Sequence, residues 1–96
     1  MRLWIGTGGG LVRLARDGSA RLELVGARVE ALSESRGGVA FVGTRGDGLF
    51  ARYAGAWRRI DATGHRDVRW VSDLAPGAGG ALWLTAGGRG LFRAGG

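Results

Sequence analysis

Short apolar segments alternate with glycine-rich turns along the whole chain. Three of these segments, Leu3–Ile5, Ala40–Val42 and Leu82–Leu84, are continuously apolar and contain an aromatic residue. Apolar runs of this length, bounded by glycines, are typical of β-strands covered on both faces, whereas the alternation of Arg21–Leu24 is typical of a half-exposed strand. Since no longer stretch shows helical periodicity with capping residues, the pattern predicts an all-β fold.

The segments belong to a repeat. Each aromatic segment is followed by a glycine-rich turn and a Gly-Leu pair, and the glycine of this pair recurs at positions 10, 48 and 90. The segments in between also align, since 29–34 resembles 68–73 and 21–24 resembles 57–60. Together they define a unit of about 40 residues with four short strands, which is the signature of a β-propeller blade.

The repeat units do not fill a closed ring. We expect one propeller segment with units at about 1–25 (partial), 29–60 (full) and 68–96 (partial), or about two and a half blades, whereas a closed propeller usually needs at least four. Open blade faces and sheet edges expose apolar and hydrogen-bonding surface. The expected partners are therefore other propeller blades, supplied by self-association or by the rest of a longer chain. The aromatic residues at one shared position of the units are expected to pack between neighbouring blades: Trp4, Phe41 and Trp83.

Two stretches carry a resemblance to a known family. Residues 3–7 read Leu-Trp-Ile-Gly-Thr and are followed by Gly-Gly-Leu, and residues 41–44 read Phe-Val-Gly-Thr and are followed by Gly-Leu-Phe at 48–50. With these motifs the sequence resembles the two-component-regulator type of propeller repeat and the related BNR-like repeats. The resemblance covers nearly the whole chain and implies the β-propeller fold, but such blades support many unrelated functions. Residues 15–20 do not match the Asp-box of sialidases, Ser/Thr-x-Asp-x-Gly-x-x-Trp, so a true sialidase is not expected.

Charge and composition argue against several classes of function. The chain has a formal net charge of +6, from 14 arginines, no lysine and 8 acids, but the arginines are scattered and only Arg58 and Arg59 are adjacent. A nucleic-acid-binding surface normally clusters its basic residues, so nucleic acid is not an expected partner. The absence of cysteine and the single histidine argue against a disulfide scaffold, a metal site or another cofactor.

Targeting and membrane-spanning segments are not visible in the sequence. No apolar run approaches the roughly 18 residues of a membrane span. The chain also opens without a basic region followed by a long apolar stretch. These observations predict no contact with a membrane and a cytoplasmic location.

The candidate binding residues lie in turns on one side of the blades. Antiparallel alternation places the turn after each aromatic strand on the same side as the connection between units. Charged residues gathered on loops of a rigid scaffold commonly form binding sites. The candidate ligand-binding residues are Arg45, Asp47, His65, Arg66, Asp67 and Arg89. The alternative is that these are solvated turn residues.

No catalytic residues are predicted. His65 and Asp67 with a serine would suggest a triad, but no serine stands in a Gly-x-Ser-x-Gly nucleophile elbow. Tyr53 lies in a repeat strand, where packing is the simpler role. We therefore expect a non-catalytic scaffold for binding, sensing or protein interaction, with a protein or carbohydrate ligand. The alternative is a carbohydrate-binding (lectin-like) or glycosidase- or sialidase-related propeller, in which Trp57 and Trp70 would stack on a sugar.

Overall fold

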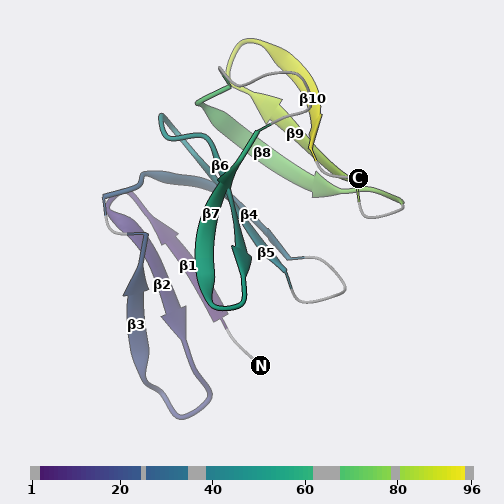
Figure 1. Cartoon of the computed structure of the whole chain (residues 1–96). Coiled ribbons are helices and arrows are strands. Elements are labelled where there is room, and N and C mark those ends of the chain that lie inside the picture. Colours follow the sequence, from purple (N-terminus) through teal and green to yellow (C-terminus); the bar gives the residue numbers. More distant parts are fainter. Residues whose placement is uncertain (1–2, 25, 35–38, 62–67, 79–80, 95–96) are drawn as a thin grey trace.

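Ten β-strands make up the described part of the chain in this computed structural model (Figure 1). The structure describes residues 3–24, 26–34, 39–61, 68–78 and 81–94. The strands form three antiparallel sheets, in the orders β1-β2-β3, β4-β5-β6-β7 and β8-β9-β10, so the predicted all-β class is confirmed. The strands are β1 Leu3–Thr7, β2 Gly10–Leu14, β3 Ala20–Glu23, β4 Val29–Glu34, β5 Ala40–Thr44, β6 Leu49–Tyr53, β7 Ala56–Ile60, β8 Val71–Pro76, β9 Leu82–Ala86 and β10 Gly90–Ala94.

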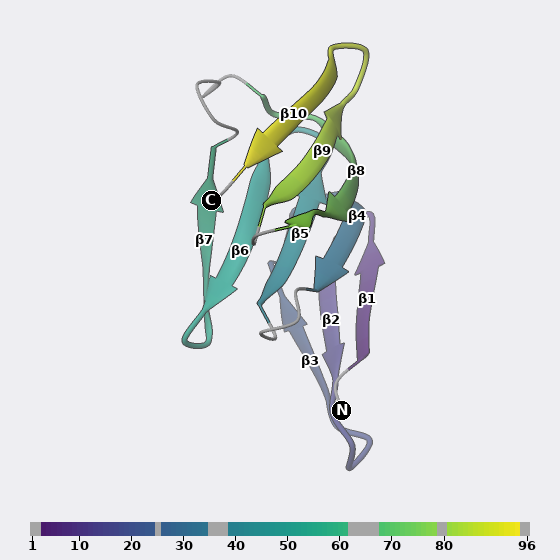
Figure 2. The ribbon, with the colours of Figure 1, turned by 90° about the vertical axis from the view of Figure 1, so that its right-hand side faces the viewer.

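The three sheets follow one another across the molecule in chain order (Figures 1 and 2). The β4–β7 sheet lies in the middle, and its first strand, β4, contacts β1 of the preceding sheet and β8 of the following sheet. The molecule measures 40 × 28 × 18 Å along its principal axes, so the stack is elongated. The described strands form this row of sheets and do not close it into a ring.

A threonine closes the turn after the aromatic strand in the first two sheets. The hydroxyl of Thr44, which is fully buried, donates to the carbonyl of Gly48 at 2.8 Å and accepts from the backbone N–H of Asp47 at 2.9 Å. Thr7 repeats the first of these bonds, donating to the carbonyl of Gly10 at 2.9 Å. Gly48 has a φ of +86°, a conformation that side chains with a Cβ rarely adopt, which explains why glycine recurs at this position of the repeat.

Glycines on the aromatic strands allow the sheets to approach closely. A Cβ added at Gly43 would lie 2.5 Å from Cγ1 of Val71, which stands at the start of β8. Gly6 has the same relation to Val29 at the start of β4. In β4 and in β8, the pairing with the next strand shifts its register directly after this valine. The same irregularity therefore recurs in both repeat units. The third sheet has Thr85 at the position of these glycines.

The main apolar core lies between the second and third sheets. Its buried residues are Leu49, Val68, Val71, Leu82, Leu84, Ala86 and Ala94. Phe41, Ile60, Leu74 and Phe92 are partly buried and pack against this cluster. The burial of this surface stabilises the packing of the second sheet against the third, because apolar area removed from water contributes about 25 cal/mol per Å² to the free energy of folding.

Two local predictions differ from the structure. The segment 68–73 was expected to form a strand, but β8 begins at Val71, and Val68 is a buried residue of the core that precedes it. Trp83 was expected to pack between neighbouring sheets as Trp4 and Phe41 do, but it is 40% exposed. The reason is topological, since Trp83 lies on the outer face of the third sheet, where no described strand covers it.

Candidate binding cleft between the first two sheets

Backbone hydrogen bonds hold the turns and connections together on one side of the stack. The N–H of Gly26, in the connection between the first two sheets, donates to the carbonyl of Gly9 at 2.9 Å. The N–H of Gly48, in the β5–β6 turn, donates to the carbonyl of Arg69 at 2.8 Å. These bonds join each turn after an aromatic strand to a connection between units. They confirm the expectation that both kinds of loop lie on the same side.

A cleft of about 540 Å³ opens to solvent among these loops. Its walls come from the β3–β4 connection, the β5–β6 turn, the strands β6 and β7, and the segment before β8. The lining residues are Leu24, Gly26, Ala27, Asp47, Phe50, Arg59 and Arg69. The cleft therefore combines two guanidinium groups, one carboxylate, one aromatic ring and backbone groups fixed by hydrogen bonds.

Arg59 is held at the rim by the second sheet. It lies opposite Phe50 across the β6–β7 pair, so the two side chains share a face. Its Nε donates to the carbonyl of Asp47 at 3.3 Å, and its Nη1 lies 3.0 Å from Oδ1 of Asp61. Both side chains of this ion pair are more than one-third exposed, so solvent screens the attraction and the pair mainly orients the guanidinium.

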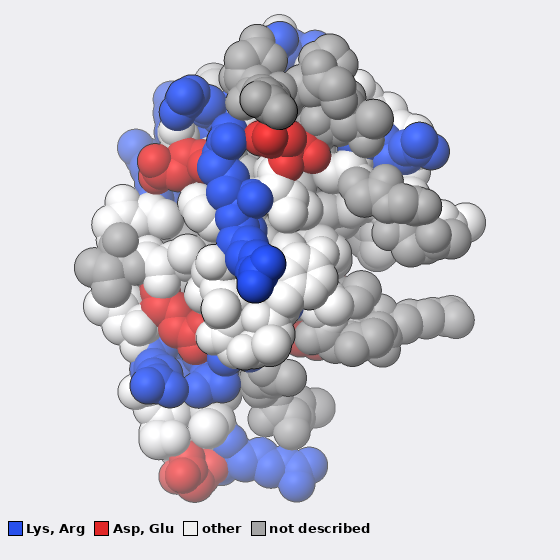
Figure 3. Space-filling model, viewed as in Figure 1, with Lys and Arg blue, Asp and Glu red and all other residues white. Residues whose placement is uncertain are grey.

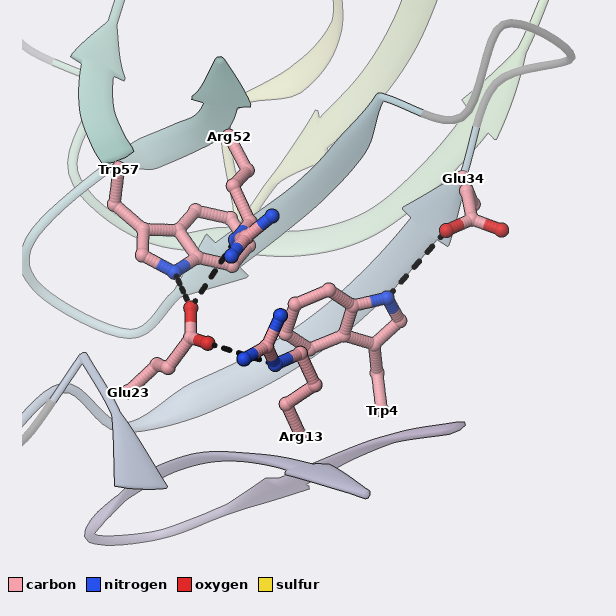
Figure 4. A network of polar contacts seen from close by, with 6 residues as sticks. All are labelled: Trp4, Arg13, Glu23, Glu34, Arg52 and Trp57. Carbon is pink, nitrogen blue, oxygen red and sulfur yellow. Dashed lines mark hydrogen bonds and ion pairs between the residues drawn. The ribbon is translucent and has the colours of Figure 1, made fainter. Parts of the chain in front are cut away.

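Next to the cleft, a buried carboxylate joins the first two sheets (Figure 4). The side chain of Glu23, at the end of β3, is only 10% exposed. Its Oε2 lies 3.2 Å from Nε of Arg13 on β2, and its Oε1 lies 3.3 Å from Nε of Arg52 on β6. Oε1 also accepts a hydrogen bond from the indole N–H of Trp57 on β7. One carboxylate therefore fixes two strands of each sheet.

Aromatic rings extend this network towards β1 and β4. The ring of Trp4 meets that of Trp57 edge to face, with centroids 5.6 Å apart and an interplanar angle of 78°. The guanidinium carbon of Arg52 lies 5.6 Å from the centroid of the Trp4 ring. The indole N–H of Trp4 donates to Oε2 of Glu34 at 3.4 Å, at the exposed side of the network (Figure 4). Edge-to-face pairs and cations over rings each contribute modestly and fix orientation.

The two inter-sheet interfaces of the chain therefore differ in chemistry. Strand register gives Ile60 in the second sheet the position that Glu23 has in the first. Each of these residues pairs with the first leucine of the neighbouring strand, β6 for Ile60 and β2 for Glu23. Ala51 likewise corresponds to Arg13, because both lie opposite the aromatic residue of the preceding strand. A polar cluster between the first and second sheets thus occupies the place of apolar packing between the second and third.

Three residues of this region were not apparent from the sequence: Glu23, Arg59 and Arg69. The alignment of 21–24 with 57–60 places Glu23 at the position of another charged residue, Arg59, and its apolar counterpart Ile60 follows only from the strand register. Arg59 and Arg69 carry no sequence signal either, because the cleft that they line is formed by segments distant in the sequence.

The structure separates the candidate ligand-binding residues that it describes. Asp47 lines the cleft. The guanidinium carbon of Arg45 lies 4.4 Å from the centroid of the Trp70 ring. Its Nη1 lies 3.8 Å from Oε1 of Glu30. Arg89 belongs to the β9–β10 turn, with its guanidinium carbon 5.7 Å from the centroid of the Phe92 ring. The other three candidates lie outside the described residues: His65, Arg66 and Asp67.

Positive and negative side chains are interspersed on the face shown in Figure 3. The described ion pairs bring Glu23, Glu30 and Asp61 next to arginines. Asp17, in the β2–β3 turn, accepts a hydrogen bond from the N–H of Ser19 at 2.9 Å. Hydrogen bonds from the Ser19 side chain and backbone hold the pKa of Asp17 below its usual value.

Within the described part of the chain, no group of three or more His, Cys, Asp and Glu side chains is placed to hold a metal ion. Nor do the described residues include a helix that is long and apolar enough to cross a membrane.

Comparisons with known proteins reveal similarity at the level of the fold. No family model matches the sequence, and no curated protein matches it either. Solved structures match the chain, and two of them are of the extracellular domain of BT4673 from B. thetaiotaomicron, which is described once as a one-component system and once as a hybrid two-component system. The first has a TM-score of 0.77 at 17% identity and covers 96% of this chain, and the second has a TM-score of 0.79 at 18% identity and covers 97%. This chain spans only 13% and 14% of their lengths.

These matches correct the expected location. Both of these solved structures are extracellular domains, which points away from the cytoplasmic location inferred from the sequence. That inference rested only on the first residues of a chain that matches about one-seventh of these domains, so it had no independent support from the fold.

Proposed function

We propose that the three sheets are blades of a β-propeller of the two-component-regulator type and that the chain is a non-catalytic binding or sensing scaffold. Three features support the propeller: the sheets follow in chain order, the first two share the threonine-closed turn, and glycines let a valine of the next sheet approach. The fold is also shared with extracellular domains of a protein described as a one- or two-component system.

The cleft among the turns is the observation that carries the binding role. It is built on loops that backbone hydrogen bonds fix to one another, and such preformed clefts on rigid scaffolds are the usual place of binding. The guanidinium of Arg69 can donate hydrogen bonds to a carboxylate, the carboxylate of Asp47 can accept hydrogen bonds, and Phe50 offers an apolar wall. We infer that the cleft takes a small polar ligand with a carboxylate and several hydrogen-bond donors.

The tryptophans do not favour the alternative of a lectin that stacks sugars on them. Trp57 donates to Glu23 and meets Trp4 edge to face between the sheets. Trp70 lies beneath Arg45 and directly against Gly87, where an added Cβ would lie 2.1 Å from the ring. The Trp57 ring is thus used in packing between the sheets, and the Trp70 ring, 39% exposed, is partly covered by Arg45 and Gly87.

A titration followed by NMR tests the proposed site. Glucuronate offers a carboxylate and hydroxyl groups, whereas glucose offers hydroxyl groups alone. We expect glucuronate to give saturable shifts of the backbone amides of Gly26, Ala27 and Asp47, and glucose to give much smaller ones. Arg69→Gln should abolish the shifts, because it removes the guanidinium that pairs with the carboxylate.

The matched control is Arg58→Gln. Arg58 is adjacent to Arg59 on β7 but faces the other side of the sheet, so the control removes the same charge without changing the cleft. Chemical-shift changes at arginines across the whole surface would show non-specific attraction to a basic protein. An equal loss of the chemical-shift changes in both variants would show the same. Either result would contradict the proposed site.

A further inference from the structure

The outer face of the third sheet exposes residues whose counterparts are buried. Leu11 and Leu49 are 0% and 2% exposed, and each lies opposite the close-approach glycine of its aromatic strand. Leu91 occupies the same position in β10, opposite Thr85, and is 65% exposed. We call this the leading face, because in the first and second sheets it is the face that packs against the following sheet.

The outer face of the first sheet shows the complementary pattern. Ile5 is 43% exposed, while Val42 and Leu84, at the same position of the next two units, are 0% and 1% exposed. Leu3 is 55% exposed on the same face. We call this the trailing face, because in the second and third sheets it packs against the preceding sheet. The two uncovered faces of the chain are thus the two halves of one kind of interface.

We propose that the leading face of the third sheet binds the trailing face of the first sheet of a second copy of this chain. Every interface inside the chain already joins a leading face to a trailing face, so the intermolecular contact continues the same stacking. Because the two faces differ, the contact is head to tail, and each copy retains one face for a further copy unless a ring closes. Two copies would supply six sheets, within the usual four to eight blades of a propeller.

Thr85 indicates why the first sheet is the partner. Inside the chain, Gly6 and Gly43 admit a valine from the first strand of the following sheet. Thr85 fills this position in the third sheet, so a sheet with such a valine cannot approach as closely. The described strands of the first sheet are β1, β2 and β3, and none of them is a counterpart of β4, so these strands bring no valine to this place.

Paired charge variants test the proposal on the 96-residue chain by light scattering or sedimentation. Leu91→Glu places a charge on the leading face, and Leu3→Glu places one on the trailing face. Both side chains are more than half exposed, so the substitutions leave the packing inside the chain intact. We expect the wild-type chain to have a concentration-dependent mass well above 10.0 kDa, and each variant alone to have the monomer mass.

A mixture of the two variants gives the decisive result. Leu91→Glu retains an intact trailing face and Leu3→Glu an intact leading face, so an equal mixture should form a one-to-one pair of about twice the monomer mass. Tyr53→Glu is the control, since Tyr53 is 45% exposed on the middle sheet, and it should associate as the wild type does.

Three outcomes would overturn the proposal. They are a wild-type chain that is monomeric at every concentration, a mixture that remains monomeric, and association by one variant alone, which would indicate contact between like faces. Leu22→Glu, at a 56% exposed position of the trailing face, repeats the test should Leu3→Glu fail to fold by circular dichroism.

Discussion

Replacing Glu23 by isoleucine probes the polar interface between the first two sheets. The substitution leaves Arg13 and Arg52 facing each other across the interface, with side chains only 26% and 15% exposed. Removing one partner of a buried ion pair typically costs 3–5 kcal/mol, because the remaining charge is left without compensation. Since Arg13 retains some contact with water, we expect a loss of about 3 kcal/mol in the free energy of unfolding.

A triple variant separates the cost of unpaired charge from the cost of altered shape. Arg13→Ala, Glu23→Ile and Arg52→Ala together reproduce the residues of the second interface, Ala51, Ile60 and Ala94. Replacing a whole buried ionic cluster by apolar residues of similar volume is often neutral or stabilising, since the desolvation penalty disappears with the charges. The two alanines are smaller than the arginines that they replace, so some packing is lost. The indole N–H of Trp57 loses its acceptor, which costs about 1 kcal/mol. We therefore expect the triple variant to be less stable than the wild type by about 1–2 kcal/mol, but more stable than Glu23→Ile alone.

Urea unfolding followed by tryptophan fluorescence measures both variants. With a slope of about 1–3 kcal/mol per molar urea for a small protein, a loss of 3 kcal/mol lowers the midpoint by about 1–3 M. All measurements use one protein concentration, because self-association would add to the apparent stability. A single variant as stable as the wild type, or a triple variant less stable than the single one, would refute the reasoning.

Two further predictions concern local structure. Gly43→Ala should lower the free energy of unfolding by about 1–3 kcal/mol in the same urea assay, because the new methyl group overlaps Val71. Gly46→Ala is the control, since open space surrounds this glycine, and it should change the free energy of unfolding by less than about 0.5 kcal/mol. Equal effects of the two substitutions would show that the close approach of the sheets is not limiting. Ionised Asp17 stabilises the fold above its unperturbed pKa, and this contribution is lost as the pH falls through the lowered one. Ser19→Ala should therefore raise the pKa of Asp17 in an NMR titration, and an unchanged value would contradict the assigned cause.

The repeat made much of the fold predictable. Short apolar runs bounded by glycines gave the aromatic strands, and Gly48 with Thr44 gave the turn that follows one of them. These features are local, since they depend on backbone conformation and on side chains a few residues apart. The side on which the turns lie followed from strand alternation alone.

The candidate cleft was much less predictable. Asp47, which lines it, was a candidate because a charged residue in a turn stands out in the sequence, but Arg59 and Arg69 line the cleft only because the sheets bring distant segments together. Arg45, another candidate, lies over Trp70, and the proximity of that ring depends on how the second and third sheets pack.

The sequence by itself therefore determined the all-β class, the repeat, and the positions of most strands and turns. Only the tertiary structure decided which faces of the sheets are covered. Leu11 and Leu91 stand at the same position of the repeat, but one is 0% and the other 65% exposed, because burial depends on the presence of a neighbouring sheet and not on the strand itself. For the same reason, only the packing of β3 against β6 and β7 turned Glu23 from a charged residue at the end of a strand into a buried link between two sheets.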